Sequence, residues 1–124
     1  MQLVKGLNEK CTATARDVSV SLNNFGTFLA QRGQPGDAEQ ALAHYTRGLE
    51  ISESLLQANP DSAQAARDVV VSHFKLAGLL AKDEEVATRH WRAYYDVLHP
   101  RVDSGMTFDP SIMRIYEDLR RRFE

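Results

Sequence analysis

The chain has 124 residues, of which 43% are apolar and 26% are charged, and its formal net charge is −2. These values are typical of one soluble globular domain and exclude the strongly basic surface that nucleic-acid binding requires. The single cysteine, Cys11, excludes an internal disulfide framework. No apolar run approaches the ~18 residues of a membrane span, and residues 1–6 lack the pattern of a secretory signal. We therefore expect a cytoplasmic protein without nucleic-acid or membrane partners.

The first strong helical pattern covers residues 11–32 and follows a short lead-in at residues 1–8. Its predicted core stripe has the i, i+4, i+7, i+11 spacing of one helix face: Val18, Leu22, Phe25 and Leu29. The Gly-Gln-Pro-Gly segment at residues 33–36 should end this helix, because proline cannot continue it and glycine tolerates left-handed geometry. Asp37 is then the predicted N-cap of the next helix.

The second expected helix covers residues 38–58. Its predicted buried face consists of Ala41, Leu42, Tyr45, Gly48, Leu49, Ser52, Leu55 and Leu56. The small residues on this face should let another helix approach closely. Asn59 and Pro60 end the helix, and Asp61 or Ser62 is the predicted cap of the helix that follows.

Three further helices are expected at residues 63–82, at about 86–98 and at 109–123. Their predicted core stripes are Val69, His73, Leu76 and Leu80, then Ala87, Trp91, Tyr94 and Leu98, then Ile112, Tyr116, Leu119 and Phe123. His99 and Pro100 should end the fourth helix, and Asp109 with Pro110 should begin the fifth. No segment alternates as a strand would, so the chain is predicted to be all-helical.

Residues 15–30 and 66–81 are two copies of one pattern, displaced by 51 positions, and eight of the sixteen aligned pairs are identical. Both copies begin with Ala-Arg-Asp-Val, and the core stripes of the first and third helices fall at the same places in the two copies. Self-similarity at a fixed period of this length is the signature of a repeat architecture.

Tandem helix-turn-helix units with small residues at fixed contacts resemble the tetratricopeptide repeat (TPR) family. In unit one the resemblance is carried by Leu22, Phe25, Gly26 and Leu29, by Ala41, Tyr45 and Gly48, and by the closing Pro60. In unit two it is carried by Leu76, Ala77 and Leu80, followed by Ala87 and Trp91. The repeat of 51 residues exceeds the usual length of about 34 and is similar to long-repeat variants in bacterial multidomain proteins.

The resemblance implies an all-α solenoid of antiparallel helix pairs, with about five helices and right-handed superhelical stacking. It implies one domain over residues 1–124, with unit one at 11–60, unit two at 61–100 and a capping helix at 109–123. It also implies a concave groove lined by the first helix of each unit. The groove positions carried over are Val20, Asn23, Thr27, Ala30 and Gln31 in unit one, and Val71, Phe74, Gly78, Ala81 and Lys82 in unit two.

No motif in the chain supports catalysis, a cofactor or a metal ion. The four histidines lack the spacing of a helical ligand pair, and one cysteine cannot build a structural zinc site. His73 is predicted to be a packed histidine with a hydrogen-bond partner. Phe74 lies off the core stripe, so it is either exposed for binding or packed on the fifth helix. Trp91, Tyr94 and Tyr95 are expected to pack in the core rather than form a binding platform.

We expect a non-enzymatic interaction module that holds a peptide or a helix in its groove. The Lys and Asn pattern by which TPR domains clamp chaperone tails is broken here, because Asn23 and Thr27 hold the first pair and Lys75 holds the third-helix position. One alternative is self-association, in which Leu3–Leu7 and the helix at residues 112–123 pair across a homodimer. Another alternative is that the chain is a regulatory fragment of a larger multidomain enzyme.

Overall fold

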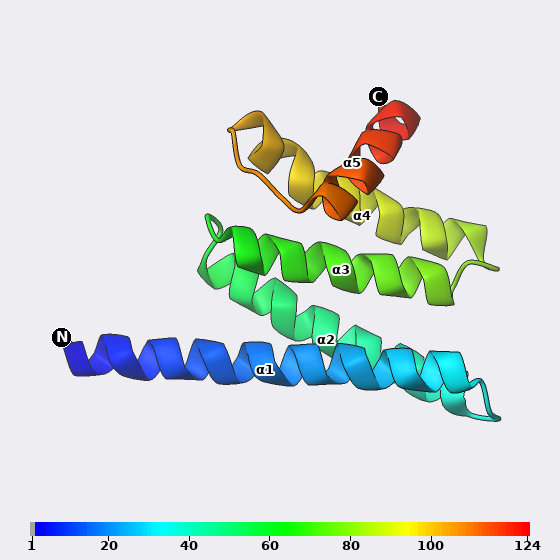
Figure 1. The fold of residues 1–124 in the computed structure, drawn as a ribbon, viewed down its shortest axis with the longest axis horizontal. Helices are drawn as coiled ribbons and strands as arrows, with labels where there is room; N and C mark the ends of the chain where they lie inside the picture. The colour runs from blue at the N-terminus through cyan, green and yellow to red at the C-terminus, as the bar shows by residue number, and fades with distance from the viewer. Residues whose placement is uncertain (1) are drawn as a thin grey trace.

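The computed structural model describes the backbone of residues 2–124 and the side chains of residues 13–124. Over this part of the chain the protein is all-helical, and no strand is present. The helices are α1 (Gln2–Arg32), α2 (Asp37–Ala58), α3 (Ala63–Leu79), α4 (Glu84–Asp103) and α5 (Pro110–Phe123). Each helix packs against the next along the chain, which is a helical-repeat arrangement (Figure 1). None of these helices is long and apolar enough to cross a membrane, within the described residues.

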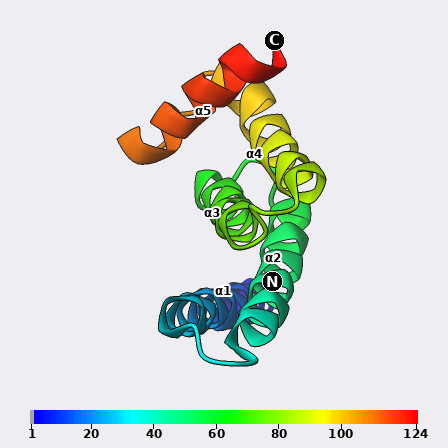
Figure 2. The same ribbon diagram turned by 90° about the vertical axis from the view of Figure 1, so that its right-hand side faces the viewer.

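The helices form two layers. Figure 2 shows α1, α3 and α5 on one side of the molecule and α2 and α4 on the other, with α2 placed between α1 and α3 along the stack. Helices α1 and α3 also touch directly, although this contact is much smaller than either makes with α2. The first helices of successive units therefore share one face of the molecule, which confirms that part of the expected architecture.

Two apolar clusters hold the stack together. One joins the first unit to α3 and consists of Leu29, Ala41, Tyr45, Leu49, Val69 and Leu76. The other joins α3, α4 and α5 and consists of Val70, Tyr94, Tyr95, Leu98, Ile112, Tyr116 and Leu119. As expected, Tyr94 and Tyr95 are core residues, and Trp91 is half-buried against them. The predicted stripe of α5 is buried on α4 except at Phe123, so within the chain this face is already occupied.

Small residues set the distance between α1 and α2, as the sequence predicted. A Cβ atom on Gly26 would lie 2.7 Å from Cε1 of Tyr45, and one on Gly48 would lie 2.8 Å from Oδ1 of Asn23. Neither position has room for a larger side chain. The hydroxyls of Ser19 and Ser52 also meet across this interface, at 3.0 Å.

The predicted cap at Asp37 is wrong by one residue. Gly36, with a left-handed φ of 84°, is the N-cap, and Asp37 is the first residue of α2. The carboxylate of Asp37 accepts two hydrogen bonds of 2.8 Å from Arg32 and one of 2.9 Å from the backbone N–H of Gln34. The hydrogen bond from Arg32 is the main reason that the pKa of Asp37 lies below its usual value. Asp37 therefore stabilises the turn between α1 and α2 instead of capping a helix.

Three other helix boundaries differ from the predictions. Helix α1 begins at Gln2, so residues 2–8 belong to it rather than to a separate lead-in, and α3 ends at Leu79 rather than near residue 82. Helix α4 continues through Pro100 to Asp103. A proline inside a helix loses one backbone hydrogen bond. The extra turn is stabilised because Val102 packs on the core and Arg101 donates a 3.1 Å hydrogen bond to the carbonyl of Pro60.

The predicted cap of α3 is confirmed. The side chain of Ser62 accepts a hydrogen bond from the backbone N–H of Ala65.

The core stripe predicted for the first helix is largely wrong. Val18 is 47% exposed and Phe25 is 49% exposed, whereas their repeat equivalents in α3, Val69 and Leu76, are 1% and 2% exposed. Only Leu29 of the stripe is fully buried. The reason is position in the stack. The stripe of α3 packs against the first unit, while within the described chain no helix covers the same face of α1. The prediction also failed at Leu42 of α2, which is 36% exposed.

Candidate functional site: the groove between α1 and α3

A hollow of about 190 Å³ lies between α1 and α3 on the side of the molecule that these helices share. Its lining residues are Arg16, Ser19, Val20, Asn23 and Asn24 from α1, and Arg67, Asp68, Val71 and Lys75 from α3. A second hollow of about 340 Å³ adjoins it and extends toward the start of α5. That part is lined by Arg16, Ala63, Gln64, Arg67, Thr107, Phe108 and Asp109. Because both hollows share Arg16 and Arg67, we treat them as one feature, the α1–α3 groove.

The duplicated Arg-Asp dipeptide ties successive units together along this groove. Arg16 donates to the carboxylate of Asp68 at 2.8 Å, so the arginine of copy one binds the aspartate of copy two. Arg67, the arginine of copy two, donates in turn to Asp109 at the start of α5, also at 2.8 Å. The sequence showed the duplication but not this role, because the pairing joins residues 42 and 52 positions apart.

Lys75 is the lining cation that forms no ion pair with a carboxylate among the described residues. Its Nζ donates to Oγ1 of Thr27 at 2.9 Å and lies 5.9 Å from the ring centre of Tyr45. An ammonium group has three N–H donors, so two of them remain for other acceptors. The lining therefore holds three cations and two carboxylates, and the two arginines already face those carboxylates.

The residues predicted for unit one divide into three groups. Val20 lines the groove. Asn23 lines it too, but is only 7% exposed, since Nδ2 donates to Oγ of Ser72 at 3.2 Å and Oδ1 lies against Gly48. The hydroxyl of Thr27 is already bound to the backbone carbonyl of Asn23, to Tyr45 and to Lys75. Finally, two exposed residues lie outside both hollows: Ala30 and Gln31.

In unit two, only Val71 of the predicted residues lines the groove. Phe74 is 46% exposed and packs edge-on against Trp91 of α4, with ring centres 5.8 Å apart. It therefore combines exposure with packing on a helix other than the expected α5. The remaining predicted residues are exposed and line neither hollow: Gly78, Ala81 and Lys82.

Sequence reasoning missed most of the polar lining, including Asn24, Arg67 and Lys75. Of these, Asn24 and Lys75 are repeat equivalents, 51 positions apart. That equivalence was the available signal, because the same register that places Val20 and Val71 in the groove also places Asn24 and Lys75 there.

A pair of neighbouring histidines, buried His73 and half-buried His90, lies away from the groove. Nδ1 of His73 is 3.0 Å from Nδ1 of His90 on α4, which confirms that His73 is a packed histidine with a hydrogen-bond partner. Burial, with a smaller contribution from the nearby His90, lowers the pKa of His73 to about 4. Within residues 13–124, no group of three or more His, Cys, Asp and Glu side chains is placed to hold a metal ion.

Comparison with known proteins returned no matching family model, no matching curated protein and no matching solved structure.

Proposed function

We propose that the protein is a non-catalytic interaction module that binds a peptide with an acidic side chain in the α1–α3 groove. The observation that carries this proposal is Lys75, whose ammonium lines the groove without a carboxylate partner among the described residues. A carboxylate that joined it would form a charge-assisted hydrogen bond, which is stronger than one between neutral groups.

The surroundings of Lys75 favour a peptide over a small anion. Val20 and Val71 supply apolar surface on the two opposing helices, and the exposed Asn24 offers an amide that could bond to a peptide backbone. The groove also continues toward α5, so it has room for several residues of an extended segment. This is the groove mode of peptide recognition, in which side-chain pockets give specificity.

Asn23 and Thr27 have a supporting role in this proposal. Asn23 is buried, and the hydroxyl of Thr27 is engaged within the protein. Thr27 holds the Lys75 ammonium at 2.9 Å and so positions it at the groove. The residues that contact the peptide are then Val20, Asn24, Val71 and Lys75.

The proposal predicts that reversing the charge of Lys75 removes binding of acidic peptides. A random peptide library displayed on phage should be selected on the immobilised full chain, and an enriched peptide should then be titrated by fluorescence anisotropy. We expect Lys75→Glu to weaken binding roughly tenfold or more, because hydrogen bonds to charged groups contribute about 1.5–3 kcal/mol. Lys82→Glu is the matched control, since it makes the same charge change outside the groove, and it should bind within about twofold of the wild type.

Enrichment without acidic residues, or equal affinity for the two glutamate variants and the wild type, would contradict the proposal. Circular dichroism should confirm that both variants keep the helical content of the parent chain. Lys75 is half-buried and interacts with Thr27 and Tyr45. Lys75→Met, which keeps most of the side-chain length without the charge, therefore serves as the second variant and should also weaken binding.

A further inference from the structure

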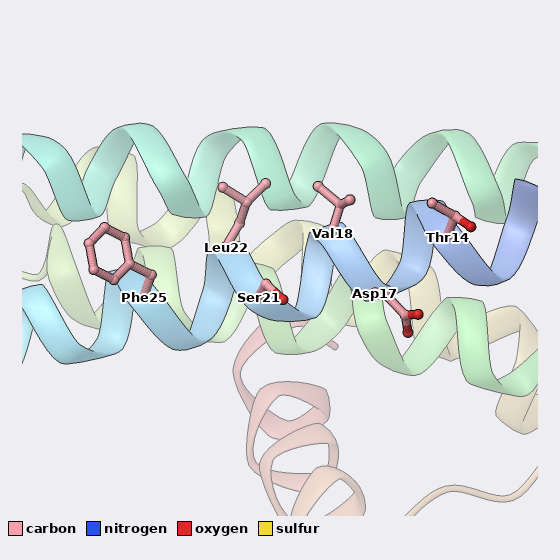
Figure 3. Close-up of a pocket in the computed structure, with 6 residues that line it drawn as sticks. All are labelled: Thr14, Asp17, Val18, Ser21, Leu22 and Phe25. Carbon is pink, nitrogen blue, oxygen red and sulfur yellow. The ribbon is translucent and has the colours of Figure 1, made fainter.

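The outer face of α1, turned away from α3, is hollowed and mainly apolar. A depression of about 420 Å³ lies on it, and all of its lining residues belong to α1: Thr14, Asp17, Val18, Ser21, Leu22 and Phe25 (Figure 3). In Figure 3, Val18 and Leu22 project from α1 on the side where α2 runs alongside it. Five of the six residues are exposed, and Leu22 is half-buried. Within the described chain, most of this surface is therefore left uncovered.

The same six positions are covered in the second copy of the repeat. Their equivalents in α3 lie 51 residues further along the chain, and all of them are buried: Ala65, Asp68, Val69, Ser72, His73 and Leu76. Aspartate, valine and serine occur at the same places in both copies, and the phenylalanine of α1 corresponds to a leucine in α3. Two similar surfaces thus differ in what covers them.

The apolar part of the α3 face is covered mainly by the second helix of unit one. Val69 and Leu76 share a cluster with Leu29 of α1 and with three residues of α2: Ala41, Tyr45 and Leu49. Helix α2 makes most of the contact with α3, and α1 makes a much smaller part. The element that buries this kind of face is therefore a pair of helices, with the second helix on the apolar positions.

The polar positions of the α3 face are matched by the first helix of unit one. Arg16 donates to the carboxylate of Asp68 at 2.8 Å, and Nδ2 of Asn23 donates to Oγ of Ser72 at 3.2 Å. The equivalent of Asp68 in α1 is Asp17, which is exposed. Among the described residues, Asp17 takes part in no ion pair. The α1 face thus has the same polar groups as the α3 face, without the partners.

We propose that the outer face of α1 is a docking surface for a helical hairpin of the same type as unit one, placed as unit one is placed on α3. The first helix of this hairpin carries an arginine that meets Asp17 and an asparagine that meets Ser21, with the spacing of Arg16 and Asn23. Its second helix lays small, aromatic and leucine side chains against the apolar part of the face. Burial of such a face against a neighbouring unit is what stabilises a stack of repeats.

A second copy of the intact chain does not offer such a hairpin. The surface of unit one that covers a first helix is already occupied by α3 of the same chain. In unit two, the corresponding surface of α4 is occupied by the apolar stripe of α5. The occupant is therefore a further repeat unit whose covering surface is free.

The test is a chain in which residues 12–62 occur twice in tandem, so that residues 1–62 are followed directly by residues 12–124. The period of 51 residues is kept, because residue 12 is the repeat equivalent of residue 63. The added unit can then reach the outer face of the original α1 through the turn that joins α2 to α3. Urea unfolding, followed by circular dichroism, compares the duplicated chain with the parent chain. We expect one transition with a higher midpoint, because a stacked unit adds an interface with its neighbour.

Substitution of Val18 supplies a matched control, because this residue occurs twice in the duplicated chain. In the original α1, Val18→Asp should remove the gain in midpoint, since it places an unpaired carboxylate in the covered face. In the added unit, where the face stays exposed, the same substitution should leave the gain intact. Asp17→Ala is a milder second variant. It should lower the midpoint in the original α1, where it removes the partner of the added Arg16, and change nothing in the added unit.

A duplicated chain whose midpoint does not rise overturns the proposal, as does an equal loss from Val18→Asp in the two places. A parent chain that forms a dimer broken by Val18→Asp, with no gain on duplication, would assign the face to a second copy and would also overturn it. The result is independent of the groove, because neither substituted residue lines it.

Discussion

Lowering the pH from 7 to 4 should reduce the free energy of unfolding by about 3 kcal/mol through His73 alone. The pKa of His73 is about 4 in the folded protein, because the ring is buried beside His90, and is near 6.5 in the unfolded chain. Between these two values the unfolded chain binds more protons, so stability falls as the pH falls. A difference of about 2.5 pKa units corresponds to about 3 kcal/mol at 1.36 kcal/mol per unit.

Urea unfolding at several pH values between 4 and 8 measures this effect. In His73→Leu, the residue at this position no longer titrates, so the dependence of stability on pH should become distinctly shallower. In His73→Gln, the side chain keeps an amide group able to hydrogen-bond but does not titrate, so the curve should flatten in the same way even if stability at pH 7 differs between the variants. A slope that is unchanged in both variants would contradict the assignment of this effect to the histidine pair.

Gly26→Ala should destabilise the protein by about 2 kcal/mol, although alanine is the better helix former. The added Cβ would lie 2.7 Å from Cε1 of Tyr45, and the ring has little freedom to move. Tyr45 is 4% exposed, its hydroxyl is 2.9 Å from that of Thr27, and the ammonium of Lys75 lies over its face. Overpacking of a well-filled core typically costs 1–3 kcal/mol.

Gly78→Ala is the matched control for this substitution. Gly78 is also helical, but a Cβ built there meets no atom within 4 Å. The change should therefore stabilise the protein by about 0.5–1 kcal/mol, which is the propensity difference between glycine and alanine in a helix. Chemical unfolding of both variants gives the comparison. If Gly26→Ala also proved stabilising, α1 and α2 would not approach as closely at Tyr45 as described.

The sequence predicted the helical repeat because helix periodicity and turn residues are local signals. It also predicted that small residues of the second helix let another helix approach closely, and α1 does approach at Gly48 and Ser52. The sequence could not determine which face of α1 a neighbouring helix covers. The stripe at Val18 and Phe25 has the pattern of a core, but a repeat buries that stripe only where a neighbouring unit covers it. The resemblance to TPR proteins remains a prediction.

Less of the groove could be predicted than of the fold. Val20, Asn23 and Val71 do line it, whereas Gln31 and Lys82 lie beyond the two hollows. The binding role proposed for Lys75 depends on which carboxylates reach which cations, and this is decided by contacts between distant units. A periodic pattern carries no such information. From the sequence alone, the ion-paired Arg16 and Arg67 cannot be distinguished from Lys75, which has no carboxylate partner among the described residues.

The most direct test of the proposed groove is nuclear magnetic resonance of the isotope-labelled chain, titrated with a peptide selected on the wild type. We expect the amide shifts that change most to map to the two facing helices, around Val20 and Asn24 in α1 and around Val71 and Lys75 in α3. Amides on the exposed side of α2, around Arg47 and Glu50, should change little. The largest changes on α2 and α4, with the facing residues of α1 and α3 unaffected, would contradict the account.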